Sequence, residues 1–228
     1  MGYRIIKRVF DLLIAIIATI IFLIPWMIIA VIIKIKSPGP AIYKAKRVGK
    51  DGRIFTLYKF RSMRVDSGAV HSTTLRGDPR IFPFGNFLRK TKLDETLQLI
   101  NILKGDMSVV GPRPEDENNA GSMYVGKYKE ILKAMPGLSS PASLYDYTFG
   151  ETYEDETLYQ KEFLPKKLGI ELYYVQHRSF WYDLKVAFKT IIIILQISFG
   201  KTSFEAPKEL MFIEKFPGNT SNLKSDKK

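Results

Sequence analysis

A run of apolar residues near the N-terminus, residues 12–33, contains no charged side chain. It is long enough for the ~20 residues with which a helix crosses the hydrocarbon core of a bilayer. No small-residue cleavage site follows the run, because Lys34, Ile35 and Lys36 come next. The run therefore does not read as a secretory signal, and the sequence predicts a membrane helix.

Pro25 and the flanking charges bear on the topology of this helix. On hydropathy alone, a single-pass anchor is the simpler interpretation. However, Pro25 removes a backbone hydrogen bond in the middle of the run and kinks a helix there. Basic residues flank the run on both sides: Arg4, Lys7 and Arg8 before it, and Lys34, Lys36, Lys44, Lys46 and Arg47 after it. Because basic flanks stay on the cytoplasmic side, we predict a re-entrant helix over residues 1–36, with the spanning anchor as the alternative.

The charge balance points to an anionic partner. The chain carries 35 Lys and Arg against 23 Asp and Glu, a formal net charge of +12. Such an excess suits phosphorylated substrates, an acidic membrane surface or nucleic acid. The absence of cysteine excludes disulfides and thiolate metal sites. Since no recognisable nucleic-acid-binding motif occurs, we expect no nucleic acid among the partners.

Turn residues and periodicity predict a small, helix-rich mixed α/β domain over residues 37–200. Residues 41–48 and 53–60 read as two short strands joined by a tight turn that contains glycine. Three stretches have helical periodicity or composition and a terminating signal: residues 86–104, closed by Gly105, residues 117–135 and residues 180–199. Repeated strand–helix alternation is missing, so a Rossmann fold is not expected.

The remaining segments are expected to lack regular structure or to lie at a surface. Residues 66–80 and 138–160 are expected to be irregular, and residues 201–228 form a polar tail that is partly disordered. The apolar stretch 191–195 within the last predicted helix is too short to cross a bilayer. That helix therefore suits an interfacial amphipathic position or a place in the core.

Candidate catalytic residues gather at a predicted helix N-terminus. Thr91 begins an N-cap pattern that places Asp94 and Glu95 in the first turn of the helix. Acidic residues there also simply complement the helix dipole. Yet a helix N-terminus binds phosphate, and Arg89 and Lys92 lie in the same region. With cations nearby, one carboxylate can attack a pyrophosphate while its neighbour holds Mg²⁺.

Two further motifs present cations. Pro112 and Pro114 stiffen the backbone around Arg113, as a bidentate phosphate contact requires, although a rigid loop with a solvated arginine is the plainer interpretation. Lys59 and Arg61 flank an aromatic residue, Phe60, at the end of the second predicted strand. They suit either a phosphate contact or a basic patch at a membrane surface, and the residues alone leave both open.

These motifs occur in an order that resembles a known family. KFRSM, DPRI, LRKTKLDE and LQLINILKGDMSVVGPRP, followed by YY and DLK, are similar to the bacterial sugar transferases, the monotopic phosphoglycosyl transferases. The resemblance covers roughly residues 4–195 and is most specific over residues 89–114. It implies a re-entrant helix broken at a proline, here Pro25, and an aspartate–glutamate pair, here Asp94 and Glu95.

The resemblance also implies an activity. Members move a sugar 1-phosphate from a UDP-sugar to polyprenyl (undecaprenyl) phosphate and release UMP, in the first membrane step of a bacterial glycoconjugate. Asp94 would form a covalent phosphosugar intermediate, and Glu95 would hold Mg²⁺. The implied substrate contacts are Lys59, Arg89, Arg113 and Asp183. The domain would lie against membrane lipid on the cytoplasmic face of the inner membrane.

Two departures from the family pattern are present. Ile24 precedes Pro25, where members often have serine, so a hydroxyl that opens the helix is absent. After Pro136 and Gly137, residues 140–147 replace the usual TG and QVxGR stretch, which leaves the sugar open. A non-enzymatic basic membrane-surface binding protein is the alternative function. It accounts for the charge and the apolar run, but not for the grouping of Asp94 and Glu95 with arginines.

Overall fold

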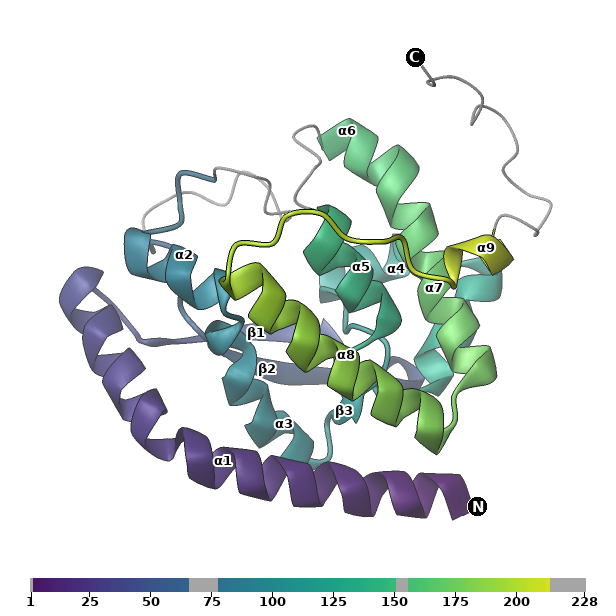
Figure 1. The fold of residues 1–228 in the computed structure, drawn as a ribbon, viewed down its shortest axis with the longest axis horizontal. Coiled ribbons are helices and arrows are strands. Elements are labelled where there is room, and N and C mark those ends of the chain that lie inside the picture. The colour runs from purple at the N-terminus through teal and green to yellow at the C-terminus, as the bar shows by residue number, and fades with distance from the viewer. Residues whose placement is uncertain (1, 66–77, 151–155, 214–228) are drawn as a thin grey trace.

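The computed structural model describes residues 2–65, 78–150 and 156–213. Within these residues the chain forms a helix-rich mixed α/β fold with two small sheets and one long apolar N-terminal helix, which confirms the predicted fold class at that level (Figure 1). Most of the irregular stretch predicted over residues 66–80, and the end of the predicted tail, lie outside the described residues.

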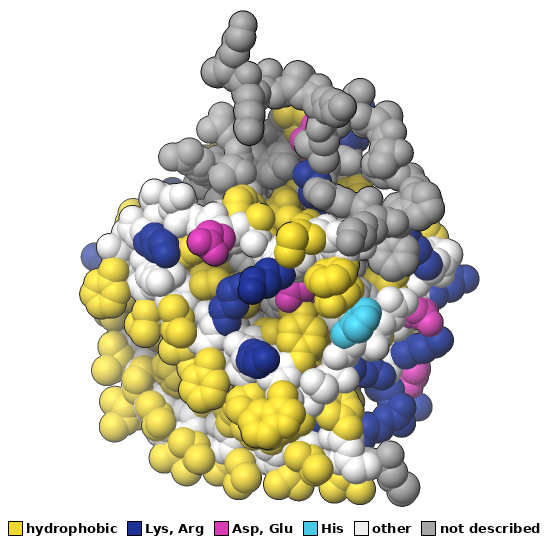
Figure 2. Space-filling view, turned by 45° about the vertical axis from the view of Figure 1, so that its right-hand side comes forward, with side chains coloured by type: hydrophobic (Ala, Val, Ile, Leu, Met, Phe, Trp, Pro, Cys, Tyr) yellow, Lys and Arg dark blue, Asp and Glu magenta, His cyan; other side chains and the backbone are white. Residues whose placement is uncertain are grey.

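The N-terminal helix α1 (Gly2–Lys36) contains Pro25 and bends as it runs along the domain (Figure 1). Four of its residues are buried against the domain: Asp11, Ala15, Ile29 and Ile33. Only 11% of its most apolar 18 residues is buried, so α1 is not an ordinary core helix. It is long and apolar enough to cross a membrane. Hydrophobic side chains gather along the lower edge of the molecule, where α1 runs (Figure 2).

The predicted hairpin is confirmed. Strands β1 (Ile42–Val48) and β2 (Ile54–Phe60) pair antiparallel, and the turn between them places Asp51 and Gly52 at positive φ. The buried amide of Asn101 joins β2 to the helix behind it. Its Oδ1 accepts from the Tyr58 N–H at 3.1 Å, and its Nδ2 donates to the Thr56 carbonyl at 2.7 Å.

The single helix predicted over residues 86–104 is wrong. The structure has α2 (Pro83–Lys90), the 3₁₀ turn η2 (Leu93–Leu97) and α3 (Gln98–Lys104) in its place. Lys92 adopts φ 56°, a left-handed conformation that breaks the helix. Thr91 does not cap the next turn, because its hydroxyl donates back to the Phe87 carbonyl at 2.8 Å. Gly105, at φ 92°, is the predicted C-cap.

The stretch 117–135 also divides into two elements. It forms α4 (Glu117–Met123) and a 3₁₀ helix, η3 (Gly126–Lys133), with Tyr124 ending the first in a non-helical conformation. Since Gly126 has φ 54°, the chain cannot continue as one helix there.

The irregular structure expected over residues 138–160 is wrong for most of that range. The helices there and just beyond are α5 (Pro141–Phe149), α6 (Glu156–Leu158), the π-helical turn η5 (Tyr159–Phe163) and α7 (Leu164–His177). Residues 151–155 lie outside the described part of the chain. The Ser140 side chain caps α5 by accepting the Ser143 N–H at 2.8 Å, and Pro141 occupies its first turn.

The last predicted helix is confirmed, and a short one follows it. Helix α8 (Phe180–Ser198) begins at a Ser179 cap, and Gly200 follows it at φ 92°. Helix α9 (Leu210–Ile213) lies within the predicted tail and packs against α7.

A second sheet was not predicted. Strands β3 (Ser108–Val110) and β4 (Gly137–Ser139) pair in parallel. The backbones nearly touch beside this pair, since a Cβ added to Gly137 would lie 2.1 Å from the Gly111 nitrogen. Only glycine fits such an approach, and it fixes the start of the loop that carries Arg113.

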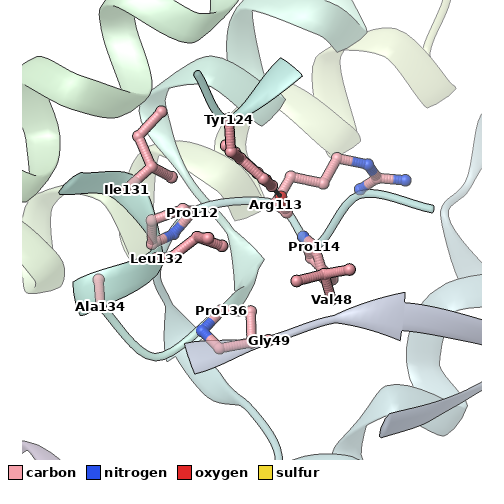
Figure 3. A pocket seen from close by; sticks show the side chains of 10 residues that line it. All are labelled: Val48, Gly49, Pro112, Arg113, Pro114, Tyr124, Ile131, Leu132, Ala134 and Pro136. Atoms are coloured by element: carbon pink, nitrogen blue, oxygen red, sulfur yellow. Dashed lines mark hydrogen bonds between the residues drawn. The ribbon is translucent and has the colours of Figure 1, made fainter. Parts of the chain in front are cut away.

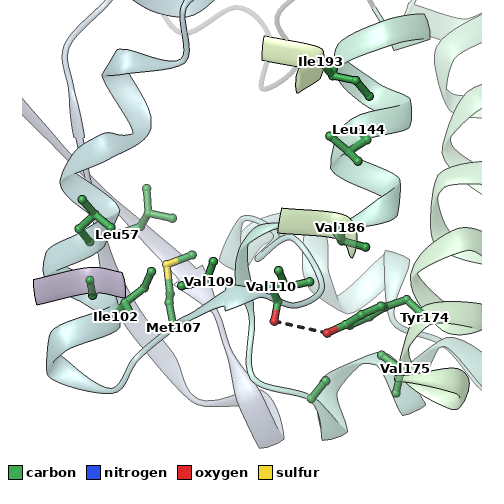
Figure 4. Close-up of a cluster of buried hydrophobic side chains, with 13 residues drawn as sticks. Leu57, Ile102, Met107, Val109, Val110, Leu144, Tyr174, Val175, Val186 and Ile193 are labelled. Carbon is green, nitrogen blue, oxygen red and sulfur yellow. Dashed lines mark hydrogen bonds between the residues drawn. The ribbon is translucent and has the colours of Figure 1, made fainter. Parts of the chain in front are cut away.

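The largest hydrophobic cluster lies between the second sheet and the helices around it. Ile102 of α3, Val110 of β3, Tyr174 of α7 and Val186 of α8 meet there, and the Tyr174 hydroxyl oxygen lies 3.4 Å from the Val110 carbonyl oxygen (Figure 4). The sheet that precedes Arg113 is therefore held by the core itself.

Gly137→Ala should destabilise the fold by about 1–3 kcal/mol, because the new methyl group forces β3 and β4 apart. Gly121→Ala is the matched control, since nothing lies within 4 Å of a Cβ at this position in α4. Thermal unfolding in detergent should show a lower midpoint for Gly137→Ala and an unchanged or slightly higher one for Gly121→Ala. Equal midpoints for the two variants would contradict the close approach.

Candidate active site

Asp94 and Glu95 lie side by side in the first turn of η2, as the sequence predicted, although without the predicted Thr91 cap. Both are buried, with exposed fractions of 3% and 8%. Two neighbouring acidic side chains removed from water need cations or hydrogen-bond donors around them. The structure supplies these unequally to the two carboxyl groups.

Glu95 is held by Arg113 in a two-point ion pair. Arg113 Nη2 lies 2.7 Å from Glu95 Oε1, and Nη1 lies 3.2 Å from Oε2. Burial favours the protonated acid, but the charges of Arg113, Lys92 and Lys59 outweigh it and hold the pKa of Glu95 well below its ordinary value. Glu95 is therefore an anion at neutral pH.

Asp94 is differently placed. None of the described residues donates a hydrogen bond to its buried Oδ1. Burial and the neighbouring Glu95 anion raise its pKa, against the opposing charges of Lys59, Lys92 and Arg89. A buried carboxylate oxygen without a donor is available to a cation or to an electrophile.

Three predicted cations surround this pair. Arg113 binds Glu95 directly, while Lys59 at the end of β2 and Arg89 near the end of α2 act on Asp94 through their charges. Burial lowers the pKa of Lys59 to about 8, and the nearby Asp94 opposes that shift. The structure thus brings together Lys59, Arg89 and Arg113 with the two acids.

Arg61, which the sequence paired with Lys59, has a different position. Its buried guanidinium donates to the carbonyls of Ser37 and Pro38, directly after α1. It therefore supports the chain where the N-terminal helix ends.

The loop that presents Arg113 is supported from α7. The Arg113 N–H donates to Glu171 Oε1 at 2.9 Å, and the Ser140 hydroxyl donates to the same oxygen at 2.9 Å. Glu171 is buried, and burial raises its pKa to about 7. One carboxyl oxygen thereby joins the Arg113 loop to the start of α5.

A small hollow lies behind this loop (Figure 3). It is lined by Val48, Gly49, Pro112, Arg113, Pro114, Tyr124, Ile131, Leu132, Ala134 and Pro136. Its space of ≈ 10 Å³ suits about one water molecule, so it does not accommodate a nucleotide. The Arg113 guanidinium points away from Ile131 and Leu132, toward the other side of the loop (Figure 3).

Asp183, the remaining predicted substrate contact, has partners outside this group. It accepts hydrogen bonds from Tyr3 at 2.7 Å, Lys7 at 2.7 Å and Tyr174 at 2.6 Å. These contacts tie α8 to α1 and α7. They give Asp183 a place in the joint between helices, and its substrate role stays a prediction.

Tyr147 of α5 was missed as a member of the site, and so was its contact with Lys92, which the sequence had placed near the two acids. The Lys92 ammonium lies 3.9 Å from the centroid of the Tyr147 ring, and the Tyr147 hydroxyl accepts from Arg113 Nη1 at 3.3 Å. The signal for α5 was the Ser140 cap followed by Pro141. Reading that signal would have put residues 140–147 on a helix, but not beside Lys92.

The acids also fit a divalent cation in part. The described residues contain no group of three or more His, Cys, Asp or Glu side chains suited to a metal ion. However, Mg²⁺ is commonly held by one or two carboxylates together with substrate phosphates. Asp94 Oδ1, which lacks a donor among the described residues, and the adjacent Glu95 anion match that donor set.

Comparison with known proteins points in one direction. A family model described as bacterial sugar transferase matches residues 2–197. The chain is 36% identical over 191 residues to the UDP-glucose:undecaprenyl-phosphate glucose-1-phosphate transferase of Escherichia coli K12. The matched stretch covers 82% of this chain and 40% of that protein.

The names of two further relatives refer to N-acetylgalactosamine instead of glucose. An Aeromonas hydrophila UDP-N-acetylgalactosamine-undecaprenyl-phosphate N-acetylgalactosaminephosphotransferase is 37% identical over 85% of this chain and 44% of its own length. A putative undecaprenyl-phosphate N-acetylgalactosaminyl 1-phosphate transferase of Bacillus subtilis is 49% identical over 50% of this chain and 64% of its own length. The chain thus spans well under half the length of the first two relatives.

The low pKa of Lys59 can be measured directly. Reductive methylation with ¹³C-formaldehyde and an NMR pH titration should give a value of about 8, with Lys59→Arg identifying the signal. Asp94→Asn should lower the value further, because it removes an anion that favours the ammonium form. Glu117→Gln, at an exposed position, should leave it unchanged. A titration near the ordinary 10.5 would contradict the burial of this amine.

Proposed function

This chain belongs to the bacterial sugar transferase family, and from that membership we propose that it moves a sugar 1-phosphate from a UDP-sugar to undecaprenyl phosphate, releasing UMP. The observation that carries the proposal is the buried Asp94, one oxygen of which has no donor among the described residues, within a ring of cations. A non-enzymatic membrane-surface role would leave this costly arrangement without a purpose.

Asp94 is the proposed nucleophile. A carboxylate oxygen attacks the β-phosphorus of the UDP-sugar, and the bond from that phosphorus to the oxygen bridging to UMP breaks. UMP leaves with the electron pair, and the sugar phosphate stays on Asp94 as an acyl phosphate. An oxygen of undecaprenyl phosphate then attacks the same phosphorus, the bond to Asp94 breaks, and the carboxylate is regained.

The surrounding cations make this attack feasible. A carboxylate and a pyrophosphate repel one another, so positive charge must be in place before they meet. Lys59, Lys92 and Arg89 all act on Asp94, and each is positioned by a different local structure. Arg113 neutralises Glu95 in the protein alone, and its fork also suits a phosphate.

Mg²⁺ completes the proposed site. Glu95 and the pyrophosphate of the substrate would hold it, and when bound it neutralises charge that develops on the phosphate oxygens. Both Glu95 oxygens accept from Arg113 in the structure. Arg113 is therefore the residue that must share its hydrogen bonds when cation and substrate enter.

The exposed apolar surface supports a proposed membrane arrangement. In the proposal, α1 enters and leaves one leaflet of the inner membrane around the bend at Pro25, and α8 lies at the interface. Exposed apolar side chains on α8 support the second part: Trp181, Phe188, Ile191, Ile192 and Leu195. The catalytic domain then faces the cytoplasm, where UDP-sugars are found.

The covalent step has a direct test. Protein quenched with a panel of UDP-sugars and Mg²⁺, without undecaprenyl phosphate, should carry a sugar phosphate on the peptide that contains Asp94, with UMP released in equal amount. Asp94→Asn should abolish the adduct, whereas Glu117→Gln, an exposed acid in α4, should keep it. EDTA should prevent the adduct and added Mg²⁺ should restore it. An adduct on another residue would refute the role of Asp94, and an adduct formed equally in EDTA would refute the metal.

Topology can be tested because the chain has no cysteine. Single cysteines at Gly2 and at Ser203, both exposed, should resist an impermeant thiol reagent in intact cells and react after lysis. Labelling of the Gly2 cysteine alone in intact cells would establish a spanning anchor. Pro25→Ala should make a fraction of that cysteine accessible, because a straight helix of this length can cross the bilayer.

A further inference from the structure

One hydrogen bond joins the membrane helix to the turn that carries the two acids. The indole Nε1 of Trp26 donates to Thr96 Oγ1 at 2.9 Å, between residues separated by 70 positions. Trp26 directly follows Pro25 in α1, and Thr96 directly follows Glu95 in η2. The contact therefore links the bend of α1 to the catalytic turn.

Thr96 makes a second hydrogen bond within the turn. Its hydroxyl donates to the Leu93 carbonyl at 2.7 Å while it accepts from Trp26. The segment closed by that bond contains Asp94 and Glu95. Two consecutive hydrogen bonds thus run from the indole to the residue that precedes the proposed nucleophile.

The turn has little support of its own. It is a 3₁₀ helix, whose hydrogen bonds are poorer than those of an α-helix, and its N-cap residue, Lys92, makes no side-chain capping bond. The Thr96 O–H can rotate about the Cβ–Oγ1 bond unless its partners hold it in one direction. Trp26 is one of these partners. The Trp26 side chain is itself fixed, because it packs against the large cluster described above and against a second cluster that contains Ile29 and Ile33 of α1.

In the proposed membrane arrangement, the surroundings of Trp26 make an acceptor for its N–H important. Trp26 lies within the apolar run of α1, where an indole N–H without an acceptor would be costly. Pro25 also removes a backbone donor at the same place. Satisfying the indole through Thr96 therefore selects the bent arrangement in which Trp26 faces η2.

We propose that Trp26 is a positioning residue. Its indole N–H orients the Thr96 hydroxyl and so holds the η2 turn, which carries Asp94 and Glu95, in a fixed position relative to the bend of α1. This role rests on the proposed function, since it acts through Asp94.

The test compares variants that remove one hydrogen-bonding group each. Trp26→Phe keeps an aromatic ring without the N–H, and Thr96→Val keeps the shape without the hydroxyl. In single-turnover formation of the Asp94 adduct, each should be slower by roughly two- to tenfold, with little change in the UDP-sugar concentration for half-maximal rate. The double variant should be no slower than the slower single variant, because both remove the same bond. Thr96→Ser should keep the wild-type rate.

Trp181→Phe, at an exposed position of α8 where 69% of the residue's surface is accessible, makes Trp26 the sole tryptophan. The Thr96 variants are then compared with one another within that background. In that background, Thr96→Val should shift the Trp26 emission, a result that does not depend on activity. Unchanged rates in Trp26→Phe and Thr96→Val, or additive losses in the double variant, would overturn the positioning role. Absence of an Asp94 adduct in the wild type would instead refute the proposed function.

Discussion

Asp11 places a buried carboxyl group on the long apolar helix α1. It remains there because both oxygens are satisfied by β3: Oδ2 accepts from Ser108 Oγ at 2.7 Å, and Oδ1 accepts from the Val109 N–H at 3.0 Å. A buried charge without such partners would cost several kcal/mol. The same strand leads into the loop that holds Arg113 against Glu95. The polar contact of Asp11 with β3 therefore connects the long N-terminal helix to the loop of the candidate active site.

Within that frame, two adjacent carboxyl groups have different environments. Glu95 has a guanidinium fork on both oxygens, and its pKa is low, whereas the pKa of its neighbour Asp94 is raised by burial and by Glu95 itself. Environments that push neighbouring pKa values apart assign different tasks to chemically similar groups. Here the division agrees with a nucleophile beside an electrostatic partner. Tyr147, from the stretch that departs from the family pattern, contacts Arg113, so this segment lies beside the candidate active site.

Local signals were enough to predict the hairpin, α8 and the C-cap at Gly105, because turn residues and a helical period are encoded in contiguous residues. The grouping of the two acids with Lys59, Arg89 and Arg113 was also predictable, since it rests on motif order. The break at Lys92 was not, because a left-handed lysine is imposed by tertiary contacts such as the one with Tyr147. The parallel pair β3–β4 escaped prediction for a related reason. Each of its strands is too short to show the alternation of apolar and polar residues that marks a strand, and the two strands lie far apart in the sequence.

The partners of α1 come much later in the chain than α1 itself. Ser108, the partner of Asp11, lies 97 residues downstream, and Asp183, the partner of Lys7, lies 176 residues downstream. At a translation rate of roughly 5–20 residues per second, the first of these gaps lasts about 5–20 s. The apolar helix is therefore made before the strand and the helix that hold its polar side chains. Because β3 and α8 can pack onto α1 only after they have been made, the contacts that join α1 to the domain form late in folding.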